Sequence, residues 1–329
     1  MARVSNIRKT ELGIGGIVLP MPCFFPSISS VKTNLPILEY LQVLFALKYP
    51  LFLISAYDLY KCQSKDLSRA ERLLNNLAAN HKIILLDSGN YEGYWRDDKK
   101  WDLDKYKKML KKTKHHLAFY FDILHREGNI NKISSVITRN VLRDQKHSSG
   151  TVIPIIHAER KEKFPGLISR VVDKLNPFMI AVPERQLGDG IVARAETVYK
   201  IRQALNKKKL YYPLHLLGTG NPISILIYSV CGADSFDGLE WCQTTVDHRT
   251  GLLYHFQQRE FFGEQSAYCK LKDIPYTQAT LAHNLDFYQK WMPKIQNSFL
   301  DGKLNSLVSR YVPKAALLLL KNRIPEIFG

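Results

Sequence analysis

The stretch IILLDSGNYE at residues 83–92 decides the expected fold. It is an uninterrupted apolar run that ends in an aspartate and passes into a turn that contains a glycine. Apolar runs without alternation are typical of strands that are buried on both faces, as in parallel sheets. Seven more runs of this kind follow one another along the chain, with charged, helical segments between them: 22–26, 51–55, 117–122, 152–156, 178–182, 213–217 and 234–237.

Eight strand-and-helix units in a row predict an α/β fold, a (β/α)8 TIM barrel that covers about residues 20–238. The pattern by itself also allows an open, doubly wound sheet. A polar, aromatic-rich insertion is expected after strand 8, at 239–282, and C-terminal helices are expected over 283–329. We therefore expect one domain over residues 1–329.

The charge balance predicts a polyanionic partner. Lys and Arg outnumber Asp and Glu by 47 to 30, which gives a net charge of +17. Such an excess favours nucleic acid or an anionic membrane surface. The five cysteines have no repeated spacing that would indicate disulfides or a zinc knuckle, and no stretch approaches the length of a membrane span. A cytoplasmic protein with a nucleic-acid partner and no membrane contact is expected.

Polar side chains close several of the apolar runs, at Asp87, Asp122, His157 and Asp237. Each of them alone could be a helix cap or a loop salt bridge. Three aspartates at the mouth of one barrel favour chemistry, because active sites of this fold lie where the strands end. Two carboxylates suit displacement at an anomeric carbon, where one attacks and the other moves protons. Their spacing leaves glycosidase and transglycosylase both open.

Seven segments, in order along the chain, resemble motifs of the tRNA-guanine transglycosylase superfamily. LLDSGNYE at 85–92 resembles its DSGGFQ motif, and SFDG at 235–238 resembles MFDC. The other five are CFFPSISSVKT at 23–33, YFDILH at 120–125, AVPERQLGDG at 181–190, LLGTGNP at 216–222 and AHNLDFYQKWMPKIQNSFLDGKL at 282–304.

The resemblance implies a pentosyltransferase that exchanges guanine in nucleic acid for another base. Asp237 would be the nucleophile that forms a covalent link to the sugar, and Asp87 the general acid and base. The implied substrate-binding residues are Ser88, Gly89, Tyr91, Asp122, His157, Glu184, Arg185, Leu217 and Gly218. Among them, Asp122 and His157 would read the base, which would be stacked between Tyr91 and Leu217.

Two departures from the family pattern concern specificity and metal binding. Pro183, Glu184 and Arg185 replace a Gly-Gly-Leu segment, so Glu184, Arg185 or Asp189 could read a nitrile on the incoming base or form a loop salt bridge. Of the family's zinc motif, CxCxxC followed by a histidine, only Cys269 and His283 remain. We therefore expect no metal and no other cofactor, with Cys242, His248 and His255 as the alternative ligands.

The remodelled loops resemble most closely the DpdA-type enzymes, which insert 7-cyano-7-deazaguanine into DNA. DNA is thus favoured over tRNA, and the need for protein partners stays open. Alternatives are a tRNA-guanine transglycosylase without zinc and a non-catalytic nucleic-acid-binding subunit. A metal-dependent barrel hydrolase ranks last, because the strand ends carry no HxH pair.

Two basic runs, at 99–116 and 202–212, are the candidates for phosphate contacts. Tyr94, Trp95 and Trp241 lie near the catalytic loops in sequence and could stack on exposed bases. For the basic runs a solvated helix face is the alternative, and for the aromatic residues it is ordinary packing.

Overall fold

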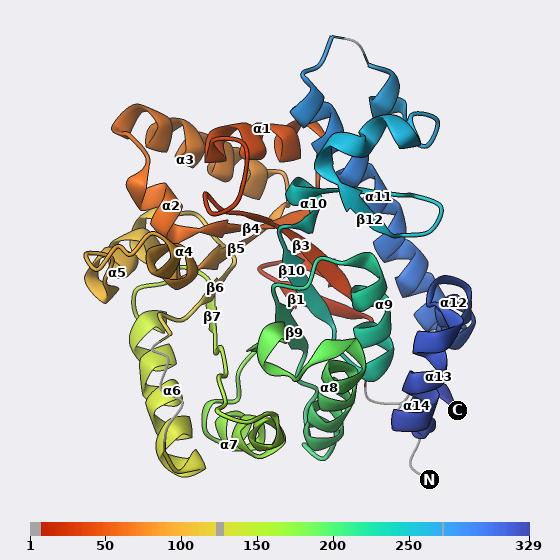
Figure 1. Ribbon diagram of the computed structural model, residues 1–329. Coiled ribbons are helices and arrows are strands. Elements are labelled where there is room, and N and C mark those ends of the chain that lie inside the picture. Colours follow the sequence, from red (N-terminus) through yellow and green to blue (C-terminus); the bar gives the residue numbers. More distant parts are fainter. Residues whose placement is uncertain (1–7, 123–127, 272) are drawn as a thin grey trace.

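The computed structural model describes residues 8–122, 128–271 and 273–329 (Figure 1). Its centre is an eight-stranded sheet in which every neighbouring pair is parallel. The strands occur in the order β7-β6-β5-β4-β3-β10-β9-β8. Their bounds are β3 Cys23–Ile28, β4 Leu51–Ser55, β5 Ile83–Asp87, β6 Leu117–Phe119, β7 Thr151–Ile153, β8 Ile180–Pro183, β9 Leu214–Leu217 and β10 Ser235–Gly238.

Backbone contacts between the segment that follows β7 and the other edge strand, β8, close the ring. Ile155 forms a parallel bridge with Ala181, the amide of Ile156 donates to the Ala181 carbonyl over 2.8 Å, and the Ala181 amide donates to the carbonyl of Pro154 over 3.0 Å. The sheet is therefore a barrel, and the prediction of a (β/α)8 fold is confirmed. Each of the eight apolar runs overlaps one strand, and two of them, 51–55 and 83–87, match their strands residue for residue.

Helices surround the barrel because its strands are apolar on both faces (Figure 1). All five residues of β4 are buried, for example, so the outer face of this strand needs a helical cover. The helices between the strands are α1 Ile37–Ala46, α2 Ala56–Lys61, α3 Ser64–Ala79, α4 Asn90–Trp95, α5 Leu103–Lys112, α6 Ile130–Gln145, η2 Lys161–Lys163, α7 Phe164–Leu175, η3 Glu184–Gln186, α8 Gly190–Asn206 and α9 Pro222–Cys231.

The expected insertion and C-terminal helices follow β10. The insertion contains a small antiparallel pair and short helical turns, and α11 begins at Tyr276, seven residues before the expected boundary at 283. Pro275 precedes this helix, and proline fits there because it fixes the backbone and has no amide to leave unpaired. The elements are α10 Glu240–Gln243, β11 Thr244–Val246, β12 Leu253–His255, η4 Phe256–Phe262, η5 Ala267–Lys270, α11 Tyr276–Leu300, α12 Leu304–Tyr311, α13 Lys314–Arg323 and α14 Pro325–Phe328.

An N-terminal hairpin, which was not predicted from the sequence, lies at the end of the barrel where the strands begin. Strands β1 Glu11–Ile14 and β2 Ile17–Pro20 pair antiparallel before the first barrel strand. A Cβ built on the turn residue Gly15 would lie 3.9 Å from the ring of His116, the residue just before β6. The hairpin therefore lies at the end where the barrel strands begin.

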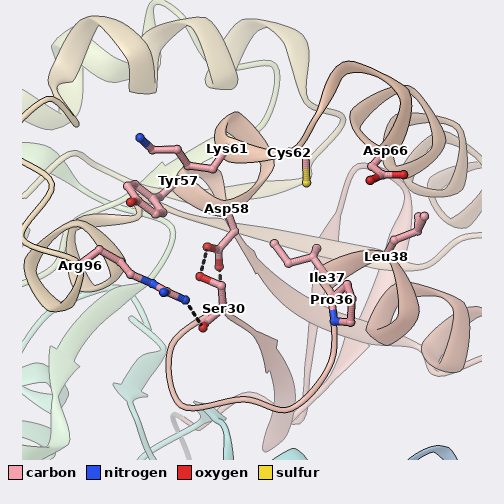
Figure 2. A pocket seen from close by; sticks show the side chains of 10 residues that line it. All are labelled: Ser30, Pro36, Ile37, Leu38, Tyr57, Asp58, Lys61, Cys62, Asp66 and Arg96. Carbon is pink, nitrogen blue, oxygen red and sulfur yellow. Dashed lines mark hydrogen bonds between the residues drawn. The ribbon is translucent and has the colours of Figure 1, made fainter.

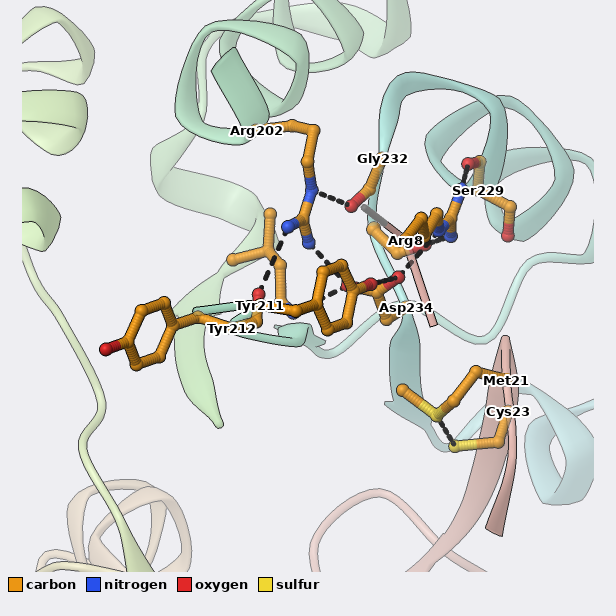
Figure 3. A network of polar contacts seen from close by, with 11 residues as sticks. Arg8, Met21, Cys23, Arg202, Tyr211, Tyr212, Ser229, Gly232 and Asp234 are labelled. Carbon is orange, nitrogen blue, oxygen red and sulfur yellow. Dashed lines mark hydrogen bonds and ion pairs between the residues drawn. The ribbon is translucent and has the colours of Figure 1, made fainter. Parts of the chain in front are cut away.

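The same end holds a buried ion-pair network around Asp234, just before β10 (Figure 3). Arg8 donates to one carboxylate oxygen over 2.7 Å, and Arg202 from α8 pairs with the other. Tyr211 also donates to this carboxylate, and so does the amide of Leu214, over 2.9 Å. Burial raises the cost of an unpaired charge, so the two arginines make the buried Asp234 tolerable and tie the N-terminal segment to the barrel.

Over the described residues, no helix is both long and apolar enough to cross a membrane.

Candidate active site

The carboxyl ends of the strands bring together the acidic residues that the sequence singled out. Asp87 ends β5, Asp122 follows β6 and Asp237 lies in β10, all at the same end of the barrel. The charges of Asp122 and Asp237 both act on Asp87. Of the YFDILH segment at 120–125, the structure describes residues up to Asp122, and the rest lies outside the described residues.

Three donors surround the carboxylate of Asp237. The Ser27 hydroxyl on β3 donates to Oδ2 over 2.8 Å, and the His215 Nε2 lies 3.1 Å from Oδ1. The backbone amide of Gly218 also donates to Oδ1, over 3.1 Å. The residue is 7% exposed, so it retains a narrow opening to the mouth. Preorganised donors of this kind suit a negatively charged, oriented carboxylate.

Sequence reasoning missed His215, which lies in the middle of β9 and is fully buried. Its Nδ1 lies 2.8 Å from the hydroxyl of Ser235, the residue that pairs with it in register on β10. With the Ser235 hydroxyl donating to Nδ1, Nε2 carries the proton that faces Asp237. The one available signal was a histidine inside an otherwise apolar strand, LHLL at 214–217.

Asp87 has surroundings of the opposite kind. Burial raises its pKa well above the ordinary range, and the negative charges of Glu92, Asp122 and Asp237 raise it further. One backbone amide, that of Gly89, opposes this by donating to Oδ2 over 2.8 Å. Because desolvation and like charges both disfavour the ionised form, Asp87 is the carboxyl group of this mouth that is suited to carry a proton.

The tight turn after Asp87 requires Gly89. This residue has a φ of +80°, and a Cβ there would lie 2.5 Å from the Cβ of Tyr57. The turn starts α4, which carries Tyr91 at the mouth with 36% of its surface exposed. Leu217, the predicted partner for stacking, ends β9 and is half-buried. Both side chains are thus accessible at the mouth.

Asp122 is the centre of a second hydrogen-bonded group. His157 Nε2 lies 2.8 Å from Oδ2, and Ser88 and Asn90 donate to Oδ1 over 3.2 and 2.6 Å. Burial alone would raise the pKa of Asp122, but the hydrogen bond and charge of His157 and the amide of Asn90 lower it overall. The other ring nitrogen of His157 lies 3.1 Å from the Gln186 amide. Asn90 and Gln186 are site residues that the sequence did not indicate.

Glu184 and Arg185 have different surroundings in the structure. Glu184 is held by Arg194 and by the hydroxyl of Tyr228, each over 2.7 Å, which is the salt-bridge alternative for this loop. Arg185 is exposed, and its charge acts on the phenol of Tyr91. Arg185 is therefore the member of this pair that is available to a ligand at the mouth.

Two further buried acids, Glu92 and Glu240, lie close enough to the predicted aspartates to interact with their charges, Glu92 with Asp87 and Glu240 with Asp237. Burial, and then the charge of Asp58, raise the pKa of Glu92 to about 7. Its Oε1 accepts from Ser29 over 2.6 Å, while Oε2 is buried without a partner in the described structure. Burial also raises the pKa of Glu240 to about 7. The mouth thus collects carboxyl groups that stay partly protonated at neutral pH.

The prediction that Trp241 stacks on an exposed base is wrong. Its side chain is fully buried, its Nε1 donates to the Ser27 carbonyl over 2.8 Å, and its ring meets the edge of Tyr40. Trp241 instead holds in place the strand that presents Ser27 to Asp237. Tyr94 and Trp95, by contrast, are 76% and 48% exposed.

The basic run at 202–212 lies away from the mouth, which corrects the expectation of phosphate contacts there. Helix α8 returns toward the strand starts, so the segment that joins it to β9 emerges at the opposite end of the barrel. Arg202 is buried in the ion-pair network of Asp234 (Figure 3). The other run begins with the exposed Lys99 and Lys100, after α4.

The two remnants of the zinc motif lie in contact. Cys269 Sγ is 3.3 Å from His283 Nδ1, and the His248 ring stacks on the His283 ring with centroids 4.1 Å apart. His283 Nε2 is bonded to the carbonyl of Val246. Within the described ranges, no group of three or more His, Cys, Asp or Glu side chains is placed to hold a metal ion. These residues do not fit a four-ligand zinc site.

A cavity of about 410 Å³ adjoins this end of the barrel, beside α1 and α2 (Figure 2). Asp58 lies at its wall and accepts from both the amide and the hydroxyl of Ser30. Arg96 donates to the Ser30 carbonyl over 2.7 Å, and Lys61 pairs with Asp98. The charged groups of this cavity are thus largely satisfied by the protein itself.

A scan against protein-family models finds no match, and a search of curated proteins finds no related sequence.

Proposed function

We propose that this protein is a guanine transglycosylase that replaces guanine in DNA with a 7-deazaguanine base, such as 7-cyano-7-deazaguanine. The observation that carries the proposal is the contrast between two carboxyl groups at one barrel mouth. Asp237 accepts hydrogen bonds from three donors, whereas the pKa of Asp87 is raised by burial and by neighbouring acids. Two acids in opposed surroundings are the usual arrangement for a nucleophile and a general acid.

In the first displacement, the Asp237 carboxylate attacks C1′ of the target nucleoside. The C1′–N9 bond breaks and its electron pair leaves with guanine, while Asp87 gives its proton to the departing base. The product is a deoxyribosyl ester on Asp237, and Asp87 is left ionised. Its acidic neighbours make this ionised state costly, which favours the return of a proton.

In the second displacement, Asp87 takes the proton from N9 of the incoming base. The N9 electron pair forms the new bond to C1′, and the ester bond to Asp237 breaks. Asp87 is protonated again and Asp237 is a carboxylate again, so both groups are ready for another cycle. No external oxidant or reductant is required.

Base recognition is assigned to the group around Asp122. Its carboxylate, together with His157 and Asn90, offers acceptors and donors for the amide edge of a purine. Tyr91 and Leu217, both accessible at the mouth, would cover the two faces of the base. Arg185 is the exposed cation that could approach a substituent on the five-membered ring of the incoming base.

The net charge of +17 supports a nucleic-acid substrate. DNA is favoured over tRNA because the residues left from the family's zinc motif do not supply a four-ligand site. The loss of this motif, the loop at 238–256 and the DSGNYE segment at 87–92 together resemble the DNA-modifying type more than the tRNA enzymes.

The test is exchange of radiolabelled guanine into duplex DNA, single-stranded DNA and unmodified tRNA, with the Asp237→Asn variant as control. Label in DNA alone supports the proposal. Label in tRNA alone assigns the chain to the tRNA enzymes instead. Label in neither polymer, with folded protein, contradicts exchange by the isolated chain and favours a non-catalytic subunit or one that needs a partner.

A further inference from the structure

Helix α4, which follows Asp87 in the chain, presents exposed aromatic side chains. The helix begins one turn after Asp87, and Tyr94 and Trp95 at its end are 76% and 48% exposed. Their rings meet edge to face, with centroids 5.9 Å apart. Large aromatic rings in water forgo the free energy of burial, so a pair of them at the rim of a site is a candidate surface for a ligand.

Cations accompany these rings. Lys32 Nζ lies 4.2 Å from the centroid of the Trp95 ring, and Arg96 is the next residue along the chain. One Arg96 nitrogen is bonded to the Ser30 carbonyl, which fixes its guanidinium against the loop after β3 (Figure 2). Exposed Lys99 and Lys100 follow a few residues later. Aromatic rings next to positive charges are the surface that single-stranded nucleic acid requires.

The neighbouring cavity is a weaker candidate for a nucleobase. Its acid, Asp58, already accepts two hydrogen bonds from Ser30, and its cation Lys61 is paired with Asp98. A base there would have to displace these contacts. Tyr94 and Trp95 are 76% and 48% exposed, so a ring can stack on them without displacing an ion pair of the protein.

From this arrangement we infer that Tyr94 and Trp95 stack on the nucleobase next to the exchanged guanine in the strand, with the intervening phosphate beside Lys32 and Arg96. This inference rests on the proposed function, because it assumes that the guanine enters the mouth beside Asp87. It adds that the substrate strand is unpaired on at least one side of the target.

The experiment combines a protein change with a substrate change. The protein variant is the double substitution Tyr94→Ala, Trp95→Ala, and the matched control is Phe261→Ala, another exposed aromatic residue, which lies in the insertion and is 71% exposed. The substrates are single-stranded oligonucleotides with one guanine, in which the neighbour on either side is a normal base or an abasic site.

The double variant should lower kcat/KM for the intact oligonucleotide about 10- to 100-fold, mainly through KM, as expected for the loss of base stacking. An abasic neighbour on one side should lower kcat/KM of the wild-type protein by a similar factor and leave the double variant almost unchanged. The Phe261→Ala protein should behave as wild type with both substrates.

Independent effects of the two changes, or no effect of the abasic neighbours, would overturn the inference while exchange itself persists. Absence of exchange with every oligonucleotide would instead concern the proposed function. Dissociation constants from fluorescence anisotropy test the stacking without any exchange. They are measured for four combinations: wild type and the double variant, each with the intact oligonucleotide and with the one that has an abasic neighbour. Equal affinities in all four combinations would overturn the inference in that case as well.

Discussion

Two aspartates three residues apart, Asp234 and Asp237, lie at opposite ends of the same barrel strand and have opposite surroundings. Asp234, at the start of the strand, is fully buried and paired with Arg8 and Arg202. Asp237, at the other end, has a serine, a histidine and a backbone amide as its partners in the described structure. A buried charge with counter-charges is tolerated by the fold and costly to disrupt, whereas an oriented charge without a counter-charge is available for chemistry.

The largest effect is expected from Asp237→Asn. The amide cannot displace guanine, so exchange should fall by a factor of about 10⁴ or more, comparable to the loss of other catalytic nucleophiles. The free energy of unfolding should change by about 1 kcal/mol or less, because no cation loses its partner. Exchange assays and urea unfolding on the same preparation measure both quantities. Exchange at the wild-type rate would remove Asp237 from the mechanism.

Asp234→Asn is expected to show the reverse pattern. It leaves the charges of Arg8 and Arg202 buried without compensation, which should lower the free energy of unfolding by about 3–5 kcal/mol. The folded fraction should keep nearly the wild-type kcat. The control is Asp173→Asn, which breaks the half-exposed pair with Lys208 and should cost less than about 1 kcal/mol. Similar losses in the two variants would refute the comparison.

Glu92→Gln should change how stability depends on pH. The pKa of Glu92 is about 7 in the folded protein and near 4.5 when unperturbed, so the folded state holds the proton more tightly. The free energy of unfolding that this tighter proton binding contributes is fully present below pH 4.5 and is lost as the pH rises through 7. At pH 8 the loss in the free energy of unfolding is about 3 kcal/mol at most.

The free energy of unfolding of the glutamine variant should therefore change less than that of wild type between pH 5 and pH 8, as measured by urea unfolding at each pH. Glu264→Gln, a change of an exposed residue in the insertion, provides the control. A parallel pH profile for Glu92→Gln and wild type would show that Glu92 keeps an ordinary pKa.

The smallest expected effect concerns His215, which is fully buried and lies 3.1 Å from the carboxylate of Asp237. His215→Ala should lower kcat about tenfold, or about 1.4 kcal/mol in activation free energy, with KM little changed. His215→Gln can place an amide donor near the position of Nε2 and should restore part of the rate. Equal rates for the alanine and glutamine variants, after correction for the folded fraction, would leave His215 a structural role only.

Much of the barrel was predictable from the sequence, because a strand buried on both faces must be apolar throughout. The runs LFLIS at 51–55 and IILLD at 83–87 illustrate this directly. The clustering of Asp87, Asp122 and Asp237 followed from the same reasoning, since parallel strands of a barrel end on one side. The N-terminal hairpin escaped notice because its four-residue strands carry little pattern.

The partners of the predicted residues could not be read from the sequence. His215 is one polar residue in an apolar strand, and its contact with Asp237 depends on the register of β9 against β10. The choice between stacking and ordinary packing for Trp241 could not be made from the sequence, because its burial depends on which side chains pack around α10. The direction of α8 likewise moved the basic run at 202–212 away from the mouth.

The proposed first displacement forms a covalent bond between Asp237 and a deoxyribose, and trapping this bond tests the mechanism. The protein is incubated with single-stranded DNA without added base, quenched in acid and digested, and the modified peptide is located by mass spectrometry. An adduct on Asp237 is expected in wild type and in Asp234→Asn, and none is expected in Asp237→Asn. An adduct on Asp87, or active exchange with no adduct on Asp237, would contradict it.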